Sequence, residues 1–404
     1  MNNKKKKVYE RVWTMITCLA KIFIKDYKET EKAKVRQGYG ILCGAVGIVL
    51  NLFLSGIKFL AGYFSGSIAI TADAINNLSD AGSSVITLIG FKMAGQKADS
   101  DHPFGHGRIE YISGLLVAML ILMMGFELLK SSADKILHPG EVSASPLVMG
   151  ILVLSIIVKV YMSFYNSRIS KKIDSAAMAA TAKDSISDSL STLVVLLTTI
   201  LAYFTELQID GFCGVLLSVF VLWAGATAAK DTISPLLGQP PTREFVERIE
   251  ALIMEYKDQG VLGVHDLVVH DYGPGRRMLS VHVEVPSSGD ILSLHDMIDL
   301  IEHRLAKELS CSAVIHMDPV CVDDEMTNAI REKVAAIIEG MEGTVGFHDF
   351  RIVSGPTHTN LIFDVVVPYD YRMTDTEVVA YIREQVKKID ESYFAVIDVD
   401  KAYR

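Results

Sequence analysis

Long apolar stretches separated by short polar loops dominate the sequence between residues 38 and 230. A helix needs about 20 mainly apolar residues to cross a hydrocarbon core of about 30 Å, and each stretch is about that long. The most apolar parts, LLVAMLILMMGFELL (115–129) and LSTLVVLLTTILAYF (190–204), are more typical of membrane spans than of buried helices in soluble proteins. The pattern predicts six transmembrane helices, at about 40–62, 68–95, 110–132, 146–166, 177–203 and 210–230.

The pattern changes after Gln239, Pro240 and Pro241. An amphipathic stretch (242–257) is followed by HDLVVHDYG, RMLSVHVEVP, the helix-like DMIDLIEHRLAKEL, and SAVIHMDP. Short stretches with alternating apolar residues are typical of strands with one buried face. The order predicts a soluble α+β unit, helix–strand–strand–helix–strand, with an antiparallel sheet.

This unit is repeated. GVHDLVVHDYGP is similar to GFHDFRIVSGP further along, SVHVEVP to FDVVVP, and AVIHMD to AVIDVD, in the same order. Three matching segments in order indicate a second copy of the unit. The expected organisation is a basic cytoplasmic segment, a membrane transport domain, a cytoplasmic metal-binding domain and its degenerate copy, at 1–37, 38–238, 239–322 and 323–404.

Composition excludes several classes of protein. The 404 residues are 50% hydrophobic, which excludes a disordered chain, and the five cysteines are scattered without a CxxC pair, which argues against a disulfide-stapled secreted protein. A net charge of −9 argues against a nucleic-acid-binding protein. The sequence contains no P-loop, HExxH or GxSxG motif, so an enzyme is not expected.

Lysine and arginine residues are unevenly distributed between the predicted loops. They are frequent in the first 40 residues and in the loops 97–108 and 167–174, which would share one side of the membrane. The opposite loops contain few, with only Lys135 in the loop 133–145. Because basic loops stay on the cytoplasmic side, both chain termini are predicted to be cytoplasmic.

Polar side chains interrupt two of the predicted spans. Asn76 and Asp80 lie one turn apart in TADAINNLSDAGSS, and Asp184 and Asp188 lie one turn apart in TAKDSISDSLS. Ionisable groups inside a membrane are costly and indicate a functional site. Carboxylate and amide oxygens are hard donors, which favour manganese- or magnesium-like ions over zinc. The alternative is that these residues form interhelical hydrogen bonds or cap a kink; Asp73 is expected to be a vestibule or structural residue.

Histidine–carboxylate groups occur at two further places. In the loop ADSDHPFGHGR (98–108), a metal site is predicted at Asp99, His102 and His106, with Asp101 as an alternative carboxylate. The first soluble copy concentrates histidines on predicted strands and at a helix start, which predicts a second group at His265, His282, His295, His316 and Asp318. In both places the alternative is ordinary surface histidines.

The second soluble copy has lost most of this set. Asp364 stands where the first copy has His282, and Asp398 and Asp400 stand where it has His316 and Asp318. His348 alone remains, matching His265. The second copy is therefore expected to serve as packing surface, with weak binding of a hard ion as the alternative.

Residues 35–322 resemble the cation diffusion facilitator family of metal transporters, through the six spans, the intramembrane ligand pairs, the HPFGHGR loop and the histidine-bearing unit. The resemblance implies a homodimer in a lipid bilayer that exports divalent metal from the cytosol in exchange for protons. It also implies a cytoplasmic domain of ferredoxin-like, metallochaperone-like fold. It assigns the transport site to Asn76, Asp80, Asp184 and Asp188, the loop site to Asp99, His102 and His106, and the cytoplasmic sites to His265, His282, His295, His316 and Asp318.

The metal is predicted on two grounds. Zinc-transporting members usually have aspartate at the position of Asn76 and histidine at that of Asp184, so this set resembles the bacterial manganese-exporting branch. The donor-hardness argument points the same way. The prediction is a multi-pass manganese exporter of the bacterial inner membrane, with metal as substrate and regulator. Export of zinc, iron or cadmium, a channel, and a metal sensor that does not transport are the alternatives.

Overall fold

The computed structural model describes residues 15–30, 32–65, 68–138, 146–205, 210–273, 275–344 and 346–402. Two compact units divide the chain: one contains Met1–Gln239 and Tyr272–Arg276, the other Pro240–Asp271 and Arg277–Arg404. Of the predicted basic segment, residues 1–14 lie outside the described residues. Its described part begins with the short helix α2 (Met15–Phe23).

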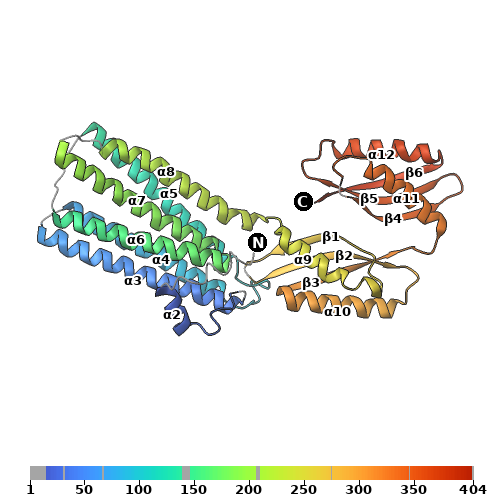
Figure 1. Ribbon diagram of the computed structural model, residues 1–404, viewed down its shortest axis with the longest axis horizontal. Helices are drawn as coiled ribbons and strands as arrows, with labels where there is room; N and C mark the ends of the chain where they lie inside the picture. The colour runs from blue at the N-terminus through green and yellow to red at the C-terminus, as the bar shows by residue number, and fades with distance from the viewer. Residues whose placement is uncertain are drawn as a thin grey trace. The chain divides into compact units, whose positions relative to one another are not determined.

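Six long helices form a bundle in the first unit (Figure 1). Each covers one predicted span: α3 (Ala33–Ser65), α4 (Ile68–Ala94), α5 (Ile109–Leu137), α6 (Pro146–Ile173), α7 (Ala176–Thr205) and α8 (Asp210–Leu237). At 1.5 Å per residue, all are longer than a hydrocarbon core is thick. By length and composition alone, α3, α5, α6 and α8 are apolar enough to cross a membrane. The more polar α4 and α7 contain the predicted carboxylates.

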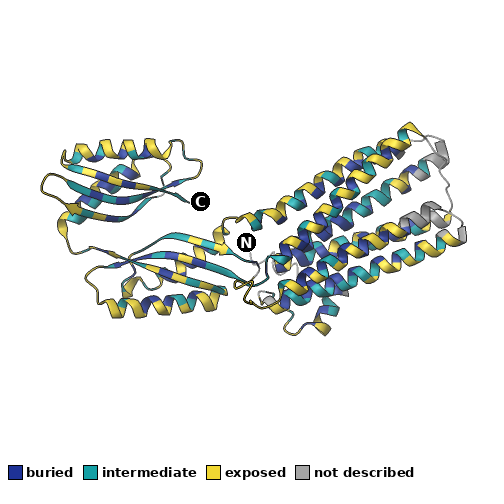
Figure 2. Cartoon of the chain, turned by 180° about the vertical axis from the view of Figure 1, so that it is seen from behind, coloured by how far each residue is buried: buried dark blue, intermediate teal, exposed yellow. Residues whose placement is uncertain are grey.

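The bundle has small residues where helices pack and large apolar residues on its outside. A Cβ atom on Gly44 of α3 would lie 2.8 Å from Cβ of Leu88 on α4, and one on Gly114 of α5 would lie 2.9 Å from Cα of Ala177 on α7. Only glycine permits such close helix packing. Exposed residues, coloured yellow, occur along the helices of the bundle (Figure 2), and many of them are large and apolar, among them Met123, Leu216 and Trp223. This is the surface that lipid contacts in a membrane protein.

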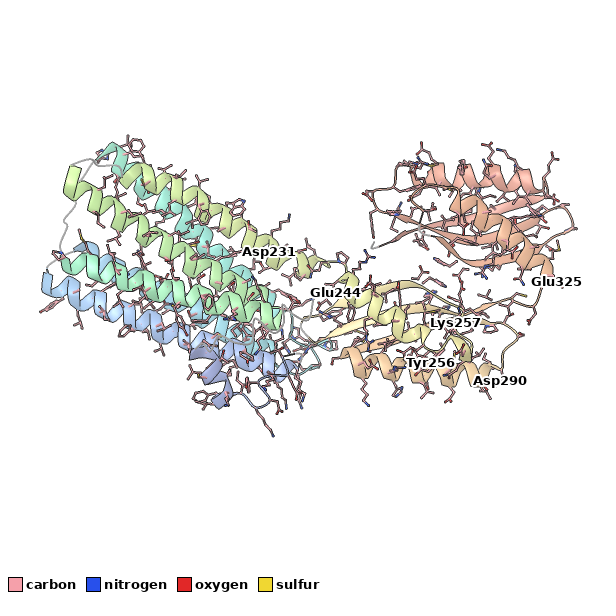
Figure 3. All side chains as sticks on the ribbon, viewed as in Figure 1. Asp231, Glu244, Tyr256, Lys257, Asp290 and Glu325 are labelled. Carbon is pink, nitrogen blue, oxygen red and sulfur yellow. The ribbon has the colours of Figure 1, made fainter. Side chains whose placement is uncertain are left out.

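The second unit contains two copies of one α+β motif. The first consists of α9 (Arg243–Met254), β1 (Gly263–Asp271), β2 (Arg277–Pro286), α10 (Ile291–Leu309) and β3 (Cys311–Val320). The second consists of α11 (Glu325–Glu339), β4 (Gly346–Ser354), β5 (Thr359–Pro368), α12 (Asp375–Ile389) and β6 (Tyr393–Ala402). Asp290 caps α10 by accepting a hydrogen bond from the backbone of Ser293, and Glu325 begins α11 (Figure 3).

The prediction of an antiparallel sheet is wrong for one strand pair in each copy. β1 and β2 are antiparallel, but β2 and β3 are parallel, and the second copy repeats this with β4, β5 and β6. The reason is the helix between the paired strands, because α10 or α12 returns the chain to the end of the sheet where the preceding strand began. The strand orders are β1-β2-β3 and β4-β5-β6.

Both helices of each copy pack on the same face of its sheet. In the second copy, alternate residues of β5 such as Leu361 and Phe363 are buried against Val334 of α11 and Ile382 of α12. In the first copy, Val281 of β2 is buried in the same way against α9 and α10. Because side chains alternate along a strand, the residues between these core positions project from the sheet face that the copy's own helices leave uncovered. The predicted ligand His282 is among them, and so is Asp364, which occupies the equivalent position in the second copy.

Candidate metal sites

Three of the predicted intramembrane carboxylates lie together inside the bundle. Asp80 on α4 and Asp188 on α7 both accept hydrogen bonds from Nζ of Lys159 on α6, each at 2.7 Å. Asp184 accepts a hydrogen bond of 3.1 Å from the hydroxyl of Ser83. Asp80, Asp184 and Lys159 are all buried. Sequence positions more than a hundred residues apart are thus brought to one polar centre.

A polar seam between α4 and α7 positions these carboxylates. Residues three to four apart lie on one helix face, and each helix contributes such a row. Thr87 and Thr181 lie 3.0 Å apart between their hydroxyl oxygens, and the Ser83–Asp184 hydrogen bond lies one turn further along. Asp80 and Asp188 follow one more turn along, joined through Lys159. Residues spaced one turn apart in the sequence therefore make successive contacts between two antiparallel helices.

The structure places the two neighbouring asparagines of α4 differently. Asn76, the predicted amide ligand, is exposed, whereas Asn77 is 3% exposed. The participation of Asn76 in a metal site stays a prediction. The side chain of Asp73 lies outside the described residues.

Sequence reasoning missed the buried lysines. Lys159 is 3% exposed and Lys58, on α3, is 2% exposed; the charge of Lys58 also acts on Asp80. Both stand in the sequence as single basic residues within apolar stretches. An ionisable group inside a membrane span indicates a functional site, and this rule applies to these lysines as it does to the carboxylates. Their significance depends on which groups they meet, and only the packing of α3 against α4 and of α6 against α7 reveals that.

The predicted loop cluster is present between α4 and α5. Asp99 Oδ2 lies 3.4 Å from Nε2 of His106, and Asp99 Oδ1 lies 3.5 Å from Nδ1 of His102. The backbone N–H of His102 donates to Asp99 and holds the pKa of that carboxyl below its ordinary value. The carbonyl oxygen of Lys97, 3.2 Å from Nδ1 of His106, orients that ring. The three ligand atoms lie close enough to share one ion.

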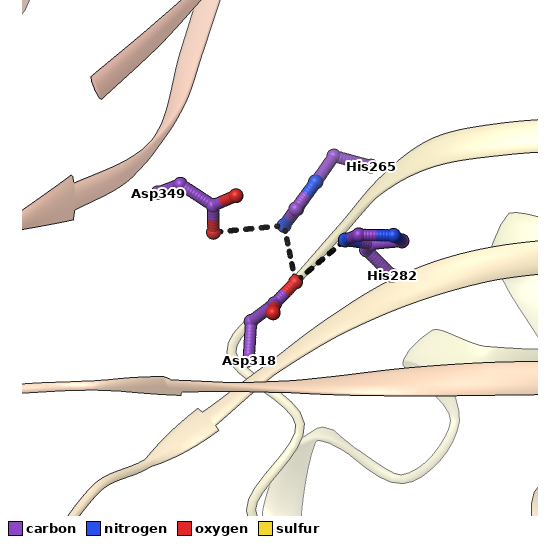
Figure 4. A group of neighbouring side chains, drawn as sticks. All are labelled: His265, His282, Asp318 and Asp349. Atoms are coloured by element: carbon purple, nitrogen blue, oxygen red, sulfur yellow. Dashed lines mark hydrogen bonds and ion pairs between the residues drawn. The ribbon is translucent and has the colours of Figure 1, made fainter. Parts of the chain in front are cut away.

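The cytoplasmic cluster forms on adjacent strands of the first copy. Strand pairing places His265 opposite His282 and His282 opposite His316. Asp318 lies among them: its Oδ2 is 2.8 Å from Nδ1 of His282 and 3.4 Å from Nε2 of His265 (Figure 4), and its Oδ1 is 3.2 Å from Nε2 of His316. Imidazole nitrogens and carboxylate oxygens are both common ligands of divalent transition metals.

Three features of this cluster differ from the sequence prediction. His295 is exposed on α10 and belongs to none of the groups of converging ligand atoms found among the described residues. His316 is exposed on β3 and, although it lies near Asp318, belongs to none of these groups either. Asp349, which was not predicted, belongs to the group of His265, His282 and Asp318, although it lies on β4 of the second copy (Figure 4). The sequence did contain a signal for Asp349: the His-Asp pair in the first strand of the first copy recurs in the first strand of the second copy as His348 and Asp349.

Together these features define a polytopic membrane protein with carboxylates buried in its helix bundle and a soluble α+β unit that carries a histidine–carboxylate group. Residues 45–237 match the cation efflux transmembrane domain, and residues 241–320 match the cytoplasmic domain of cation efflux proteins. An uncharacterized transporter of Methanocaldococcus jannaschii is 32% identical over 276 residues, which are 68% of this chain and 96% of that protein. The chain therefore belongs to the cation diffusion facilitator family and is a cation efflux transporter rather than an enzyme.

Two further relatives have names that mention efflux. The manganese efflux system protein MneS of Bacillus subtilis is 28% identical over 284 residues, covering 68% of this chain and 94% of that protein. The cation-efflux pump FieF of Salmonella agona is 24% identical over 292 residues, covering 71% and 96%. The second copy of the α+β motif begins beyond the residues that match the family.

Proposed function

We propose that the protein exports Mn²⁺ from the cytosol in exchange for protons, and that the ion binds between α4 and α7. The observation that carries this proposal is the convergence of Asp80, Asp184 and Asp188 in the buried centre of the bundle. Carboxylate oxygens suit Mn²⁺ better than they suit softer ions. Similarity to a protein named for manganese efflux supports the same ion. Asn76, one turn before Asp80, is the proposed fourth ligand.

The ammonium group of Lys159 occupies the proposed site as a cation that the metal ion can replace. Its ammonium group bridges Asp80 and Asp188, so a divalent ion that takes these carboxylates must displace it. Even with Lys58 counted, the three carboxylates outnumber the ammonium groups near them. The cluster therefore has a surplus of negative charge that either a metal ion or protons can neutralise. Because a carboxylate must lose its proton to bind metal, the two compete, which is the basis of proton exchange.

The orientation follows from the loops. The Lys- and Arg-rich loops support an orientation with both chain termini in the cytoplasm of a bacterial cell and the α+β unit on the same side of the inner membrane. The proposed assembly is a homodimer. The group at Asp99, His102 and His106 would hold metal on the cytoplasmic side of α4 and α5. Binding at His265, His282 and Asp318 would regulate the transporter by favouring one conformation of the cytoplasmic unit.

Purified protein in proteoliposomes, with a Mn²⁺-sensitive dye inside and an imposed pH gradient, tests the transport site. We expect Asp80→Asn and Asp188→Asn to reduce Mn²⁺ uptake to background, because an amide binds the ion more weakly and cannot exchange a proton. Asp231→Asn is the matched control, since Asp231 lies on α8 at the surface of the bundle, paired with Lys183 (Figure 3). Undiminished Mn²⁺ flux in both site variants would eliminate the proposed site.

Two further measurements separate the alternatives. Mn²⁺ flux without a matching proton flux would indicate a channel, and no flux in the intact protein would indicate a sensor. Competition among Mn²⁺, Zn²⁺ and Fe²⁺ tests which metal the transporter selects. Asn76→Asp combined with Asp184→His should shift preference toward Zn²⁺, because imidazole is the softer donor. An unchanged order of preference would show that these positions do not select the metal.

A further inference from the structure

The two α+β copies present equivalent residues to one another. His265 and Asp266 of β1 correspond to His348 and Asp349 of β4, and the strand pairings His265–His282 and His348–Asp364 are equivalent in register. The contacts between the copies are reciprocal. Nε2 of His265 lies 3.5 Å from Asp349 Oδ1, and Nε2 of His348 lies 3.5 Å from Asp266 Oδ1. Each copy thus offers a carboxylate to the other copy's histidine.

Within each copy the histidine also meets a carboxylate of the third strand. Nε2 of His265 lies 3.4 Å from Asp318, and Nε2 of His348 lies 3.4 Å from Asp400. The rings of His265 and His348 stack with centroids 4.0 Å apart and planes 16° apart. The pairs are therefore related by an approximate twofold axis that passes between the two histidines.

A local irregularity repeated in both strands brings the adjacent histidine and aspartate into the same site. Strand pairing shifts register directly after His265 and again after His348. At the bulge, Asp266 has a φ of 49° and Asp349 a φ of 56°, a left-handed conformation that aspartate tolerates better than most residues. In a regular strand, consecutive side chains would point to opposite faces. The bulge removes this alternation, so both side chains reach the surface between the copies.

The two histidines are buried without hydrogen-bond partners. Their side chains are 8% and 7% exposed, and none of their four ring nitrogens has a hydrogen-bond partner within the described residues. Burying such groups unpaired is costly. The nitrogen–oxygen separations of 3.4–3.5 Å are long for hydrogen bonds. They match the spacing of about 3.3 Å expected between ligands of one tetrahedral ion at bond lengths of about 2.0–2.1 Å.

We propose that the second copy serves as an intramolecular partner of the first, and that the two copies together bind two divalent ions at their shared surface. One ion is held by His265, His282 and Asp318 of the first copy with Asp349 of the second. The other is held by His348, Asp364 and Asp400 of the second copy with Asp266 of the first. Converging ligand atoms are found in both groups. The second copy lies beyond the residues that match the family models, so this shared site includes residues outside the matched domains.

The two sites differ in donor chemistry. The first ion would have two imidazoles and two carboxylates, and the second one imidazole and three carboxylates. Fewer nitrogen donors make the second site the harder one, so it should prefer Mn²⁺ over Zn²⁺ relative to the first. Partial burial raises the pKa of Asp364 and of Asp400, and neighbouring carboxylates raise both further. This crowding of negative charge is relieved when a dication binds.

The competing interpretation is a set of imidazolium–carboxylate ion pairs with no metal. Burial lowers the pKa of His265, but its neighbours Asp266 and Asp349 outweigh that effect and raise the pKa above its ordinary value. Both interpretations predict close contact between the copies. They differ in whether the purified protein retains metal at these residues, which can be counted.

The test counts ions per chain in the full-length protein in detergent, by equilibrium dialysis against Mn²⁺ and elemental analysis. The double variant Asp364→Asn with Asp400→Asn should lose about one equivalent of Mn²⁺ relative to the wild type. His358→Ala is the matched control, because His358 belongs to the second copy but is exposed and contacts Thr357 and Phe394. An unchanged count in the double variant would overturn the proposal, whether or not the protein transports Mn²⁺.

A second variant keeps the test decisive if the double variant misfolds. Asp364→His installs the imidazole that the first copy has at His282 and keeps a metal-binding side chain. We expect the preference of the second site for Zn²⁺ over Mn²⁺ to rise at least about tenfold in competitive dialysis. No change in the relative amounts of bound Zn²⁺ and Mn²⁺ would also overturn the proposal, since it would show that position 364 does not bind the ion.

Discussion

The ammonium group of Lys159 makes two charge-assisted hydrogen bonds of 2.7 Å, to Asp80 and to Asp188. A hydrogen bond to a charged group contributes roughly 1.5–3 kcal/mol. When a metal ion binds both carboxylates, these two hydrogen bonds are lost, at a cost of about 3–6 kcal/mol. Any new hydrogen bonds that the ammonium group makes elsewhere reduce this cost. Lys159→Met keeps an unbranched side chain of similar length and removes the charge. The variant should leave the carboxylates free for the ion.

We expect Lys159→Met to bind Mn²⁺ at least about tenfold more tightly, equivalent to about 1.4 kcal/mol, in calorimetric titration of the detergent-purified protein. The metal-free variant should also unfold more easily, because its buried carboxylates have lost their counter-charge. Lys183→Met is the matched control, since Lys183 lies on α7 and pairs with the exposed Asp231 at 2.8 Å. Equal or weaker Mn²⁺ binding by Lys159→Met, with the control unchanged, would refute competition between the lysine and the ion.

Three further predictions concern stability. Arg36 and Glu110 form a buried ion pair with two hydrogen bonds of 2.6 and 2.9 Å. Glu110→Gln leaves the charge of Arg36 buried without a counter-charge, so it should lower the free energy of unfolding, measured by thermal denaturation, by about 3–5 kcal/mol. A loss below about 1 kcal/mol would contradict this expectation. Leu361 is fully buried, so Leu361→Ala should cost about 2–5 kcal/mol, and hydrogen exchange should accelerate in the second copy but not in the first. A backbone hydrogen bond from Thr374 lowers the pKa of Glu377. The amides at the start of α12 should therefore lose protection from hydrogen exchange as pH falls through that lowered pKa. Glu377→Gln should abolish this pH dependence.

Much of the architecture could be predicted because it depends on local pattern. The six long helices follow from the length of the apolar stretches, and the two α+β copies follow from repeated segments with alternating apolar residues. Loop residues close in sequence, such as Asp99 and His106, could be grouped for the same reason. The direction of pairing between β2 and β3 was predicted incorrectly, because alternation along a strand does not distinguish parallel from antiparallel pairing; that direction depends on the helix that connects the two strands.

The asparagines of α4 show why periodicity alone does not determine a site. At about 100° per residue, Asn76 lies about 40° to one side of Asp80 and Asn77 about 60° to the other. A helix-face argument cannot decide between them, because both positions lie within about 60° of Asp80. Packing against the neighbouring helices determined the rotation of α4, which buries Asn77 and exposes Asn76.

The sequence by itself determined the elements and the residue types that could bind a cation, because the spacing of hydrophobic residues shows locally which face of a helix or strand is buried. Only the tertiary structure decided which of these residues meet. It brought Lys159 to the carboxylates of α4 and α7, and it placed Asp349 of the second copy beside His265 of the first. Contacts between distant segments depend on how whole helices and sheets pack, and no short stretch of sequence encodes that packing.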